Sequence, residues 1–149
     1  MGERRYIKPA AGDRLFNSLI AGLARLGIGV YGARILAVRG RKSGQWRTVP
    51  VNLLELAGSR YIVAPRGETE WVRNLRASKS GELRLGTRRE PFKATELAGA
   101  DKIPILRAYV AKWWFEVKRF FELSGPDAPD SEIARIASSH PVFRIEGEG

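Results

Sequence analysis

Residues 40–50, Gly-Arg-Lys-Ser-Gly-Gln-Trp-Arg-Thr-Val-Pro, form the segment whose residue types and spacing best fit a chemical role. Three cations, Arg41, Lys42 and Arg47, stand with two glycines and the Ser43 hydroxyl in a turn between two apolar runs. Such a turn gathers positive charges and backbone N–H groups in one concave place, which is how proteins bind phosphate. We therefore expect a phosphate-bearing, nucleotide-like cofactor at a strand–turn–strand junction.

Composition excludes several other chemistries. The 149 residues contain no cysteine, so disulfides, thiolate metal sites and cysteine nucleophiles are ruled out. One histidine is too few for the common zinc sites. No apolar run approaches the ~20 residues that a membrane-spanning helix needs. Asp13, Asn17 and Arg25 interrupt the apolar stretch near the N-terminus, which argues against a signal peptide. We expect a cytoplasmic protein.

The chain is strongly basic, with 26 Lys and Arg against 16 Asp and Glu and a net charge of +10. Such a surplus attracts polyanions, whether nucleic acid, anionic lipid or a multiply charged cofactor. For most of the arginines we favour a solvated surface without a specific ligand. The close group of Arg41, Lys42 and Arg47 is the exception.

The elements that would position this group are short strands and tight turns. Strand patterns cover residues 33–39, 46–56, 60–65, 82–87 and 90–97, with a last strand at 141–145. The connections within 33–65 and 82–97 are short and glycine-containing, which indicates antiparallel pairing. No strand–GxGxxG–helix unit occurs, so a Rossmann site is not supported.

Helical patterns complete the expected fold. An amphipathic helix over about residues 13–27 follows Asp13, a good N-cap. We favour packing of this helix on the core, with contact to a membrane surface as the alternative. A short helix is predicted over residues 70–77. A longer helix rich in aromatic residues follows Asp101, its predicted N-cap, with Pro104 in its first turn. A brief third helix includes Ile133 and Ile136. We expect one domain over 1–149, mainly β with peripheral helices (α+β), as an antiparallel barrel-like sheet.

Three motifs in order resemble the deazaflavin (F420)-dependent nitroreductase and F420H2-dependent quinone reductase family. They are the Gly40–Val51 segment, the run from Tyr61 to Gly67, and the run from Trp71 to Arg76. The closing segment 140–145 is also similar to that family's last strand. The resemblance implies a split β-barrel of the FMN-binding type that binds coenzyme F420, an 8-hydroxy-5-deazaflavin carrying a phospholactyl oligoglutamate tail. It also implies hydride transfer to a small-molecule acceptor: a quinone, a nitro compound or a conjugated enone.

The resemblance assigns cofactor contacts residue by residue. Phosphate and tail ligands are Arg41, Lys42 and Arg47, with a hydroxyl from Ser43 and a backbone N–H from Gly44. The face of the deazaflavin would be lined by Pro50, Val51 and Asn52. The edge of the ring would meet a loop formed by Ala64, Pro65, Arg66 and Gly67. A short helix that carries Trp71 and Asn74 would close the site.

Hydride transfer needs no nucleophile, since the cofactor carries the chemistry and the protein orients it. Tyr109 is the candidate proton donor, with core packing as the favoured alternative. His140 is expected to make a local structural hydrogen bond. Trp71 either stacks on the ring or only fixes its helix, and Asn74 makes a helix-terminus bond or a cofactor contact.

Departures from the family pattern leave the acceptor open. Asn52 stands where an aromatic residue is common, and Pro65 where a serine is frequent. The alternatives are a split barrel that binds FMN, haem or another tetrapyrrole, and a non-enzymatic module for a polyanion or a membrane. FMN is less favoured than F420, and we expect no nucleic-acid partner.

Overall fold

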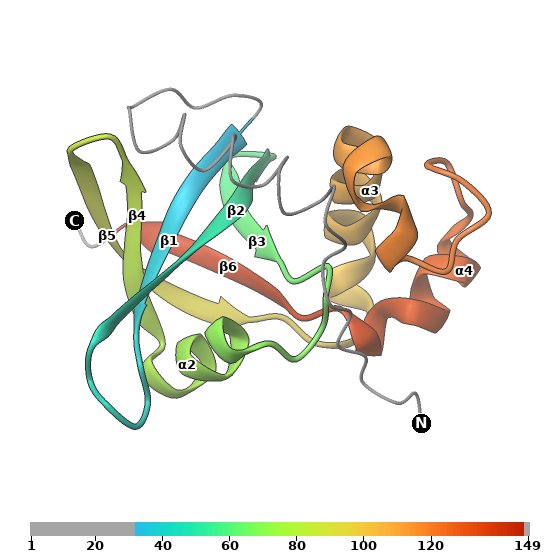
Figure 1. Cartoon of the computed structure of the whole chain (residues 1–149). Helices are drawn as coiled ribbons and strands as arrows, with labels where there is room; N and C mark the ends of the chain where they lie inside the picture. The colour runs from blue at the N-terminus through green and yellow to red at the C-terminus, as the bar shows by residue number, and fades with distance from the viewer. Residues whose placement is uncertain (1–31, 148–149) are drawn as a thin grey trace.

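A closed barrel of six antiparallel strands forms the centre of the molecule (Figure 1). The computed structural model describes residues 32–147, so the helix expected over 13–27 lies outside the described residues. The strands run in the order β1-β2-β3-β6-β5-β4 around the barrel. Their bounds are β1 Ala33–Arg39, β2 Trp46–Leu56, β3 Ser59–Val63, β4 Ser80–Leu85, β5 Arg88–Glu96 and β6 Val142–Gly147. The predicted fold class, mainly β with peripheral helices, is confirmed.

Tight turns set the register of the hairpins. Between β2 and β3, Ala57 and Gly58 both have positive φ, 52° and 82°, and Leu56 pairs with Ser59. Two consecutive positive φ angles match the twist of a two-residue hairpin turn, which is why glycine is favoured there. β1 and β2 pair from Ala33 opposite Asn52 to Arg39 opposite Trp46.

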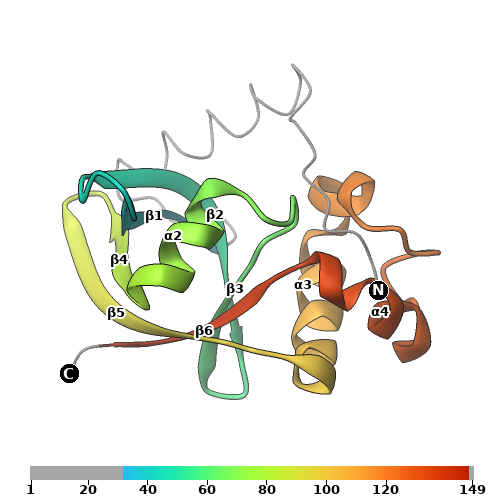
Figure 2. The same ribbon diagram turned by 90° about the horizontal axis from the view of Figure 1, so that it is seen from below.

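The helices occupy two places (Figure 2). Helix α2, Glu70–Ser78, lies across one mouth of the barrel, where its Val72 and Leu75 join the core of the barrel interior. Helix α3, Ile103–Val117, and α4, Asp130–Ile136, pack together beside the barrel. Short 3-10 turns precede α3 (η2, Gly99–Lys102), follow it (η3, Lys118–Phe120) and follow α4 (η4, Ala137–Ser139).

The predicted start of α3 needs one correction. Asp101 does not cap the helix, because it lies inside η2, and Lys102 is the residue before the first helical turn. Pro104 does lie in that first turn, as expected. The helix is interrupted at Trp113, whose φ of −117° and ψ of 26° are not helical.

Two apolar clusters build the core. One fills the barrel and includes Leu36, Leu53 and Phe143. The other lies between the barrel wall and α3 with α4, and includes Leu54, Tyr109 and Trp113. Successive residues of β2 therefore face opposite sides, because side chains alternate along a strand. None of the helices within 32–147 combines the length and hydrophobicity that a membrane crossing requires.

Candidate functional site

The basic turn between β1 and β2 is held by its own backbone. The Gly40 amide donates to the Gln45 carbonyl and the Gly44 amide to the Gly40 carbonyl, each over 2.8 Å. Gly44 has φ +71°, a conformation that glycine adopts without strain. The Gly44 N–H is thus committed within the turn. A contact between Gly44 and a ligand stays a prediction, and the positive φ also gives this glycine a conformational role.

Asn74 joins the turn to helix α2. Its Oδ1 accepts from the Arg41 backbone amide at 3.1 Å and from Arg41 Nη1 at 2.8 Å. The same Nη1 donates to Glu70 at 2.7 Å. This hydrogen bond lowers the pKa of Glu70, so the carboxylate stays ionised at neutral pH. Arg41 and Asn74 were both predicted to belong to the site, whereas Glu70 was missed, although an acidic residue in the first turn of a helix was a visible signal.

The other predicted anion ligands of the turn face solvent. Lys42, Ser43 and Arg47 are all exposed. Neither Lys42 nor Arg47 has an ion pair with another residue in the range 32–147. Ser43 Oγ accepts from the Gln45 amide at 3.2 Å, which leaves its hydroxyl proton to donate. The turn therefore presents two cations and one hydroxyl.

Trp71, also on α2, packs against the barrel. Its ring centroid lies 6.1 Å from that of Phe143, at an interplanar angle of 52°, and it adjoins the interior cluster. The helix-fixing contact that we considered is present, and stacking on a cofactor ring remains a prediction.

A second polar group lies between β2 and α3. Asn52 Nδ2 donates to both carboxylate oxygens of Glu116, at 3.3 and 3.2 Å. Asn52 also stands close enough to Tyr109 to oppose the rise in the pKa of its phenol. Glu116 was missed, and the signal for it was a carboxylate seven residues after Tyr109 on an otherwise apolar helix face.

Tyr109 is only 2% exposed, and its ring packs against Trp113 at a centroid distance of 5.0 Å. Burial raises the pKa of its phenol, and the nearby Glu116 charge adds to that effect. The hydroxyl therefore keeps its proton at neutral pH. The core packing that we favoured is present, and the proton-donor role stays a prediction.

The loop after β3 continues this second group. Ala64 is buried, and its carbonyl accepts from the Gly67 amide at 3.3 Å, where Gly67 has φ +82°. Nδ1 of buried His140 lies 3.4 Å from the same carbonyl, so its side chain makes a structural contact, but with a residue 76 positions away and not the local one expected. The Arg66 guanidinium stands 5.0 Å from the Phe120 ring centroid, so it reaches toward the end of α3. Pro65 is half-buried in the same loop.

Strand β2 connects the two groups. Asn52 follows Arg47 by five residues, which corresponds to roughly 17 Å of extended strand. Between them Pro50 is exposed, whereas Val51 packs against the barrel interior. Pro50, Val51 and Asn52 therefore do not line one surface. Pro50 and Asn52 share the outer face, and Val51 points to the other.

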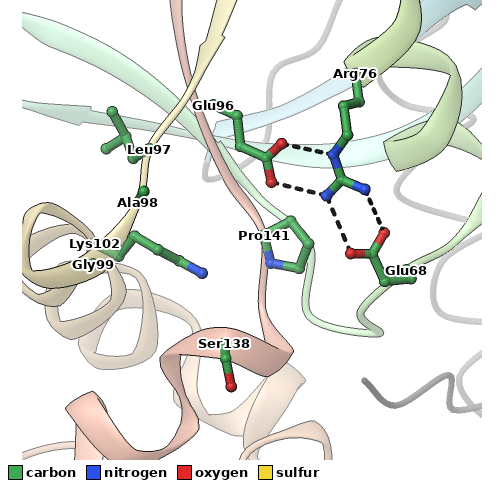
Figure 3. A pocket seen from close by; sticks show the side chains of 9 residues that line it. All are labelled: Glu68, Arg76, Glu96, Leu97, Ala98, Gly99, Lys102, Ser138 and Pro141. Carbon is green, nitrogen blue, oxygen red and sulfur yellow. Dashed lines mark hydrogen bonds and ion pairs between the residues drawn. The ribbon is translucent and has the colours of Figure 1, made fainter. Parts of the chain in front are cut away.

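A pocket of about 330 Å³ lies elsewhere, where loop 64–69, β5, η2 and η4 meet (Figure 3). None of the predicted site residues lines it. Arg76 stands on one side and pairs with Glu68 at 3.0 Å and with Glu96 at 2.7 Å. Lys102, whose ammonium group donates to the Ala137 carbonyl, also lines the pocket, so two cations balance the two carboxylates and no net charge selects a ligand. Within 32–147, no cluster of three potential metal-ligating side chains occurs.

Comparison with known proteins identifies the family. The family model described as F420H(2)-dependent quinone reductase matches residues 23–119, well over half of the chain. No curated protein matches the sequence.

Several solved structures share the fold. An F420-H2 dependent reductase (FDR-A) is 21% identical with a TM-score of 0.53, over 77% of this chain and 94% of that one. A NimC/NimA family protein from Clostridium acetobutylicum is 10% identical with a TM-score of 0.51, over 87% and 81%. A heme binding protein from Mycobacterium smegmatis is 13% identical with a TM-score of 0.50, over 95% and 52%. At these identities the likeness concerns the barrel fold alone.

The match of the family model agrees with a barrel that carries a cationic turn and a polar group around Asn52. The chain belongs to the F420H2-dependent quinone reductase family, and it is an oxidoreductase that uses coenzyme F420.

Proposed function

We propose that this protein passes hydride from reduced F420 to a quinone-type acceptor, with the cofactor reaching from the basic turn to the polar group around Asn52. The observation that carries the proposal is the distance between these two places on β2. The cationic turn stands at one end of the strand, and Asn52 lies about 17 Å from Arg47. An elongated cofactor with an anionic tail and a polar ring system needs two such ends. The family supplies the class of acceptor.

At the turn, Lys42 and Arg47 would bind the phosphate and the tail carboxylates, with a further donor from Ser43. Both cations are exposed and unpaired within the described range, so an anion can reach them without breaking an ion pair. Arg41 differs, because its guanidinium already bonds to Glu70 and Asn74. It would share its remaining N–H groups with the phosphate and hold the turn on α2.

At the polar group around Asn52, Pro50 and Asn52 would lie along the ring, while its edge would meet Ala64, Pro65, Arg66 and Gly67. Thr69 supports a ligand near this loop. Its Oγ1 is buried and has no hydrogen-bond partner within the described residues, although Thr69 is the N-cap of α2. A buried polar atom usually has a partner, and a bound ligand would supply one.

When bound, the reduced deazaflavin supplies the hydride. The protein has to orient the two reactants, exclude water and provide a proton. Tyr109 holds its proton at Oη at neutral pH and is the proposed donor. The variant Tyr109→Phe tests this, because loss of a donor lowers kcat while the affinity for F420 and the melting temperature stay near those of the wild type. A fall in melting temperature with kcat unchanged would instead assign Tyr109 to packing.

The experiment that tests the cofactor site is a fluorescence titration with oxidised F420. Replacing Lys42 and Arg47 by serine should weaken binding by roughly five- to 100-fold for each cation, since a hydrogen bond to a charged group contributes about 1–3 kcal/mol. The matched control replaces Arg88 and Arg89, two exposed arginines of β5, by serine. An equal effect of the two pairs would reject a specific tail site. Activity is then measured against quinones, nitro compounds and enones.

Haem is the less suitable ligand for this barrel. The chain has a single histidine and no cysteine. His140 is 4% exposed, bonds to the Ala64 carbonyl and stacks on Phe121 at 4.1 Å, so it is not positioned to ligate iron. FMN remains a control in the titration, and stabilisation by FMN without stabilisation by F420 would overturn the proposal.

Two further expectations belong here as proposals. We infer that the chain forms one domain over 1–149. The segment 13–27 is the candidate for peripheral contact with a membrane, where lipid-soluble quinones would be met. Changing Leu19 and Leu23 to aspartate in the full chain tests that contact by co-sedimentation with lipid vesicles.

A further inference from the structure

The C-terminal end of α3 exposes a large aromatic side chain. Phe115 is 89% exposed, and the next most exposed large hydrophobic residue within 32–147 is Trp46, at 39%. A single exposed apolar residue needs no explanation by itself. Phe115 has an unusual setting, however, because the helix is interrupted at Trp113, two residues earlier.

Cations surround this aromatic end. Lys118 Nζ lies 5.7 Å from the Phe115 ring centroid and Lys112 Nζ 4.9 Å from that of Trp113. The Arg119 guanidinium lies 5.0 Å from the Phe120 ring. All three cations are exposed. We call residues 112–119 the α3 tip.

The α3 tip has a net positive charge. Glu116 is its one acidic residue, and that carboxylate accepts from Asn52 on the barrel wall. The next acidic residue along the chain is the exposed Glu122. An anionic surface would therefore meet three cations around a protruding phenyl ring.

We propose that the α3 tip docks on an anionic lipid bilayer, with Phe115 entering the boundary between headgroups and acyl chains. Lysine and arginine side chains keep their charge at the level of the lipid phosphates while their stems lie along apolar surface. An exposed aromatic beside basic residues is typical of proteins that lie on a membrane. Charge selects this occupant over a second copy of a chain with net charge +10. Single-stranded nucleic acid stacks successive bases on several aromatic side chains, whereas Phe115 is the one large hydrophobic residue of the tip that is exposed, which favours lipid.

This surface adjoins the polar group around Asn52, where the proposed function places the cofactor ring. Glu116 of the tip bonds to Asn52, and the Arg66 side chain reaches Phe120 just beyond the tip. A quinone dissolved in the bilayer would therefore be near that group when the tip is docked. That benefit rests on the proposed quinone acceptor, whereas the docking itself does not.

The test is co-sedimentation of the full-length protein with vesicles, either of phosphatidylcholine alone or mixed with phosphatidylglycerol. We expect binding only to the mixed vesicles. Phe115→Ser should lower the partition coefficient about tenfold, equivalent to about 1.4 kcal/mol. Lys118→Ser should lower it about fivefold, as a basic residue near an anionic surface contributes about 1 kcal/mol. Phe115→Trp should keep it. The matched control is Trp46→Ser, which removes the other exposed aromatic and should change the partition coefficient less than about twofold.

The titration with oxidised F420 is run on each variant without vesicles. Unchanged cofactor affinity in Phe115→Ser separates this proposal from the proposed function, because the two can fail independently. Equal partition of the wild type and Phe115→Ser overturns the docking, as does equal binding to both kinds of vesicle. A change from dimer to monomer on gel filtration, with partition unaltered, would make the tip an interface between two copies and also overturn it.

Discussion

Asn74 offers the sharpest test of how the basic turn works. This side chain is 5% exposed and accepts two hydrogen bonds from Arg41, one from its backbone amide and one from its guanidinium. Asn74→Ala removes both. Asn74→Asp keeps an acceptor for each and places a negative charge beside the turn. The two variants therefore separate the support of the turn from its charge.

The structure sets the expected magnitudes. Asn74→Ala loses one neutral and one charged hydrogen bond, so we expect the free energy of unfolding to fall by about 2–4 kcal/mol. Asn74→Asp should lose little stability, because the Arg41 guanidinium compensates the new charge. A unit charge about 8 Å from a bound phosphate costs about 2 kcal/mol at an effective dielectric near 20. Asn74→Asp should then bind F420 roughly thirtyfold more weakly.

Denaturant unfolding and a fluorescence titration with F420 measure the two quantities. The loss of affinity in Asn74→Asp should shrink as salt is added, since a charge effect is screened. Exposed Arg88→Glu on β5 is the control for a change in charge away from the turn. If Asn74→Asp binds F420 as tightly as the wild type at low salt, no anion lies at the turn and the reasoning fails.

Two further predictions concern the barrel. The Arg60 guanidinium lowers the pKa of Glu90, so the wild type should be more stable than Glu90→Gln above about pH 4.5. This difference in stability should vanish as the pH falls through the lowered pKa of Glu90. Thermal unfolding at a series of pH values measures it, and a difference that persists in acid would contradict the prediction. Gly81→Ala would place a Cβ 2.7 Å from the Ala37 carbonyl oxygen, so its melting temperature should fall by more than that of Gly44→Ala. At Gly44 the space is open and only the positive φ opposes alanine, at a cost of about 1 kcal/mol; equal losses would refute the steric argument.

The strands were the most predictable part of the fold. The predicted bounds of β1 and β2, 33–39 and 46–56, match the structure because local signals fixed both ends. A glycine-framed turn ends one strand and starts the other, and Ala57-Gly58 adopts the positive φ angles of a hairpin. The start of α3 was less predictable. A 3-10 turn occupies Gly99–Lys102 and contains Asp101, and short 3-10 turns are frequent at the ends of α-helices, so a residue type favoured as a cap did not locate the first residue of α3.

The polar contacts of the site were hidden for a different reason. Asn52 and Glu116 are 64 residues apart, and Arg41 and Asn74 are 33 apart, so no local pattern relates them. The periodicity of apolar residues in α3 indicates which face of the helix is buried. It does not indicate that Glu116, at the edge of that face, contacts Asn52 on β2. The alternation along β2 was visible, and it could have separated Val51 from Pro50 and Asn52.

The structure also gives a reason why a few cations, among many, would bind a cofactor. Several arginines are held by carboxylates, as in the pairs of Arg60 with Glu90, Arg76 with Glu68 and Arg107 with Asp130. An anion could bind them only by displacing a partner that is already in place. Lys42 and Arg47 carry no such partner within 32–147, and a backbone-braced turn holds them together. Anion binding at this turn would therefore form new interactions rather than exchange old ones, which favours it over more numerous arginines elsewhere.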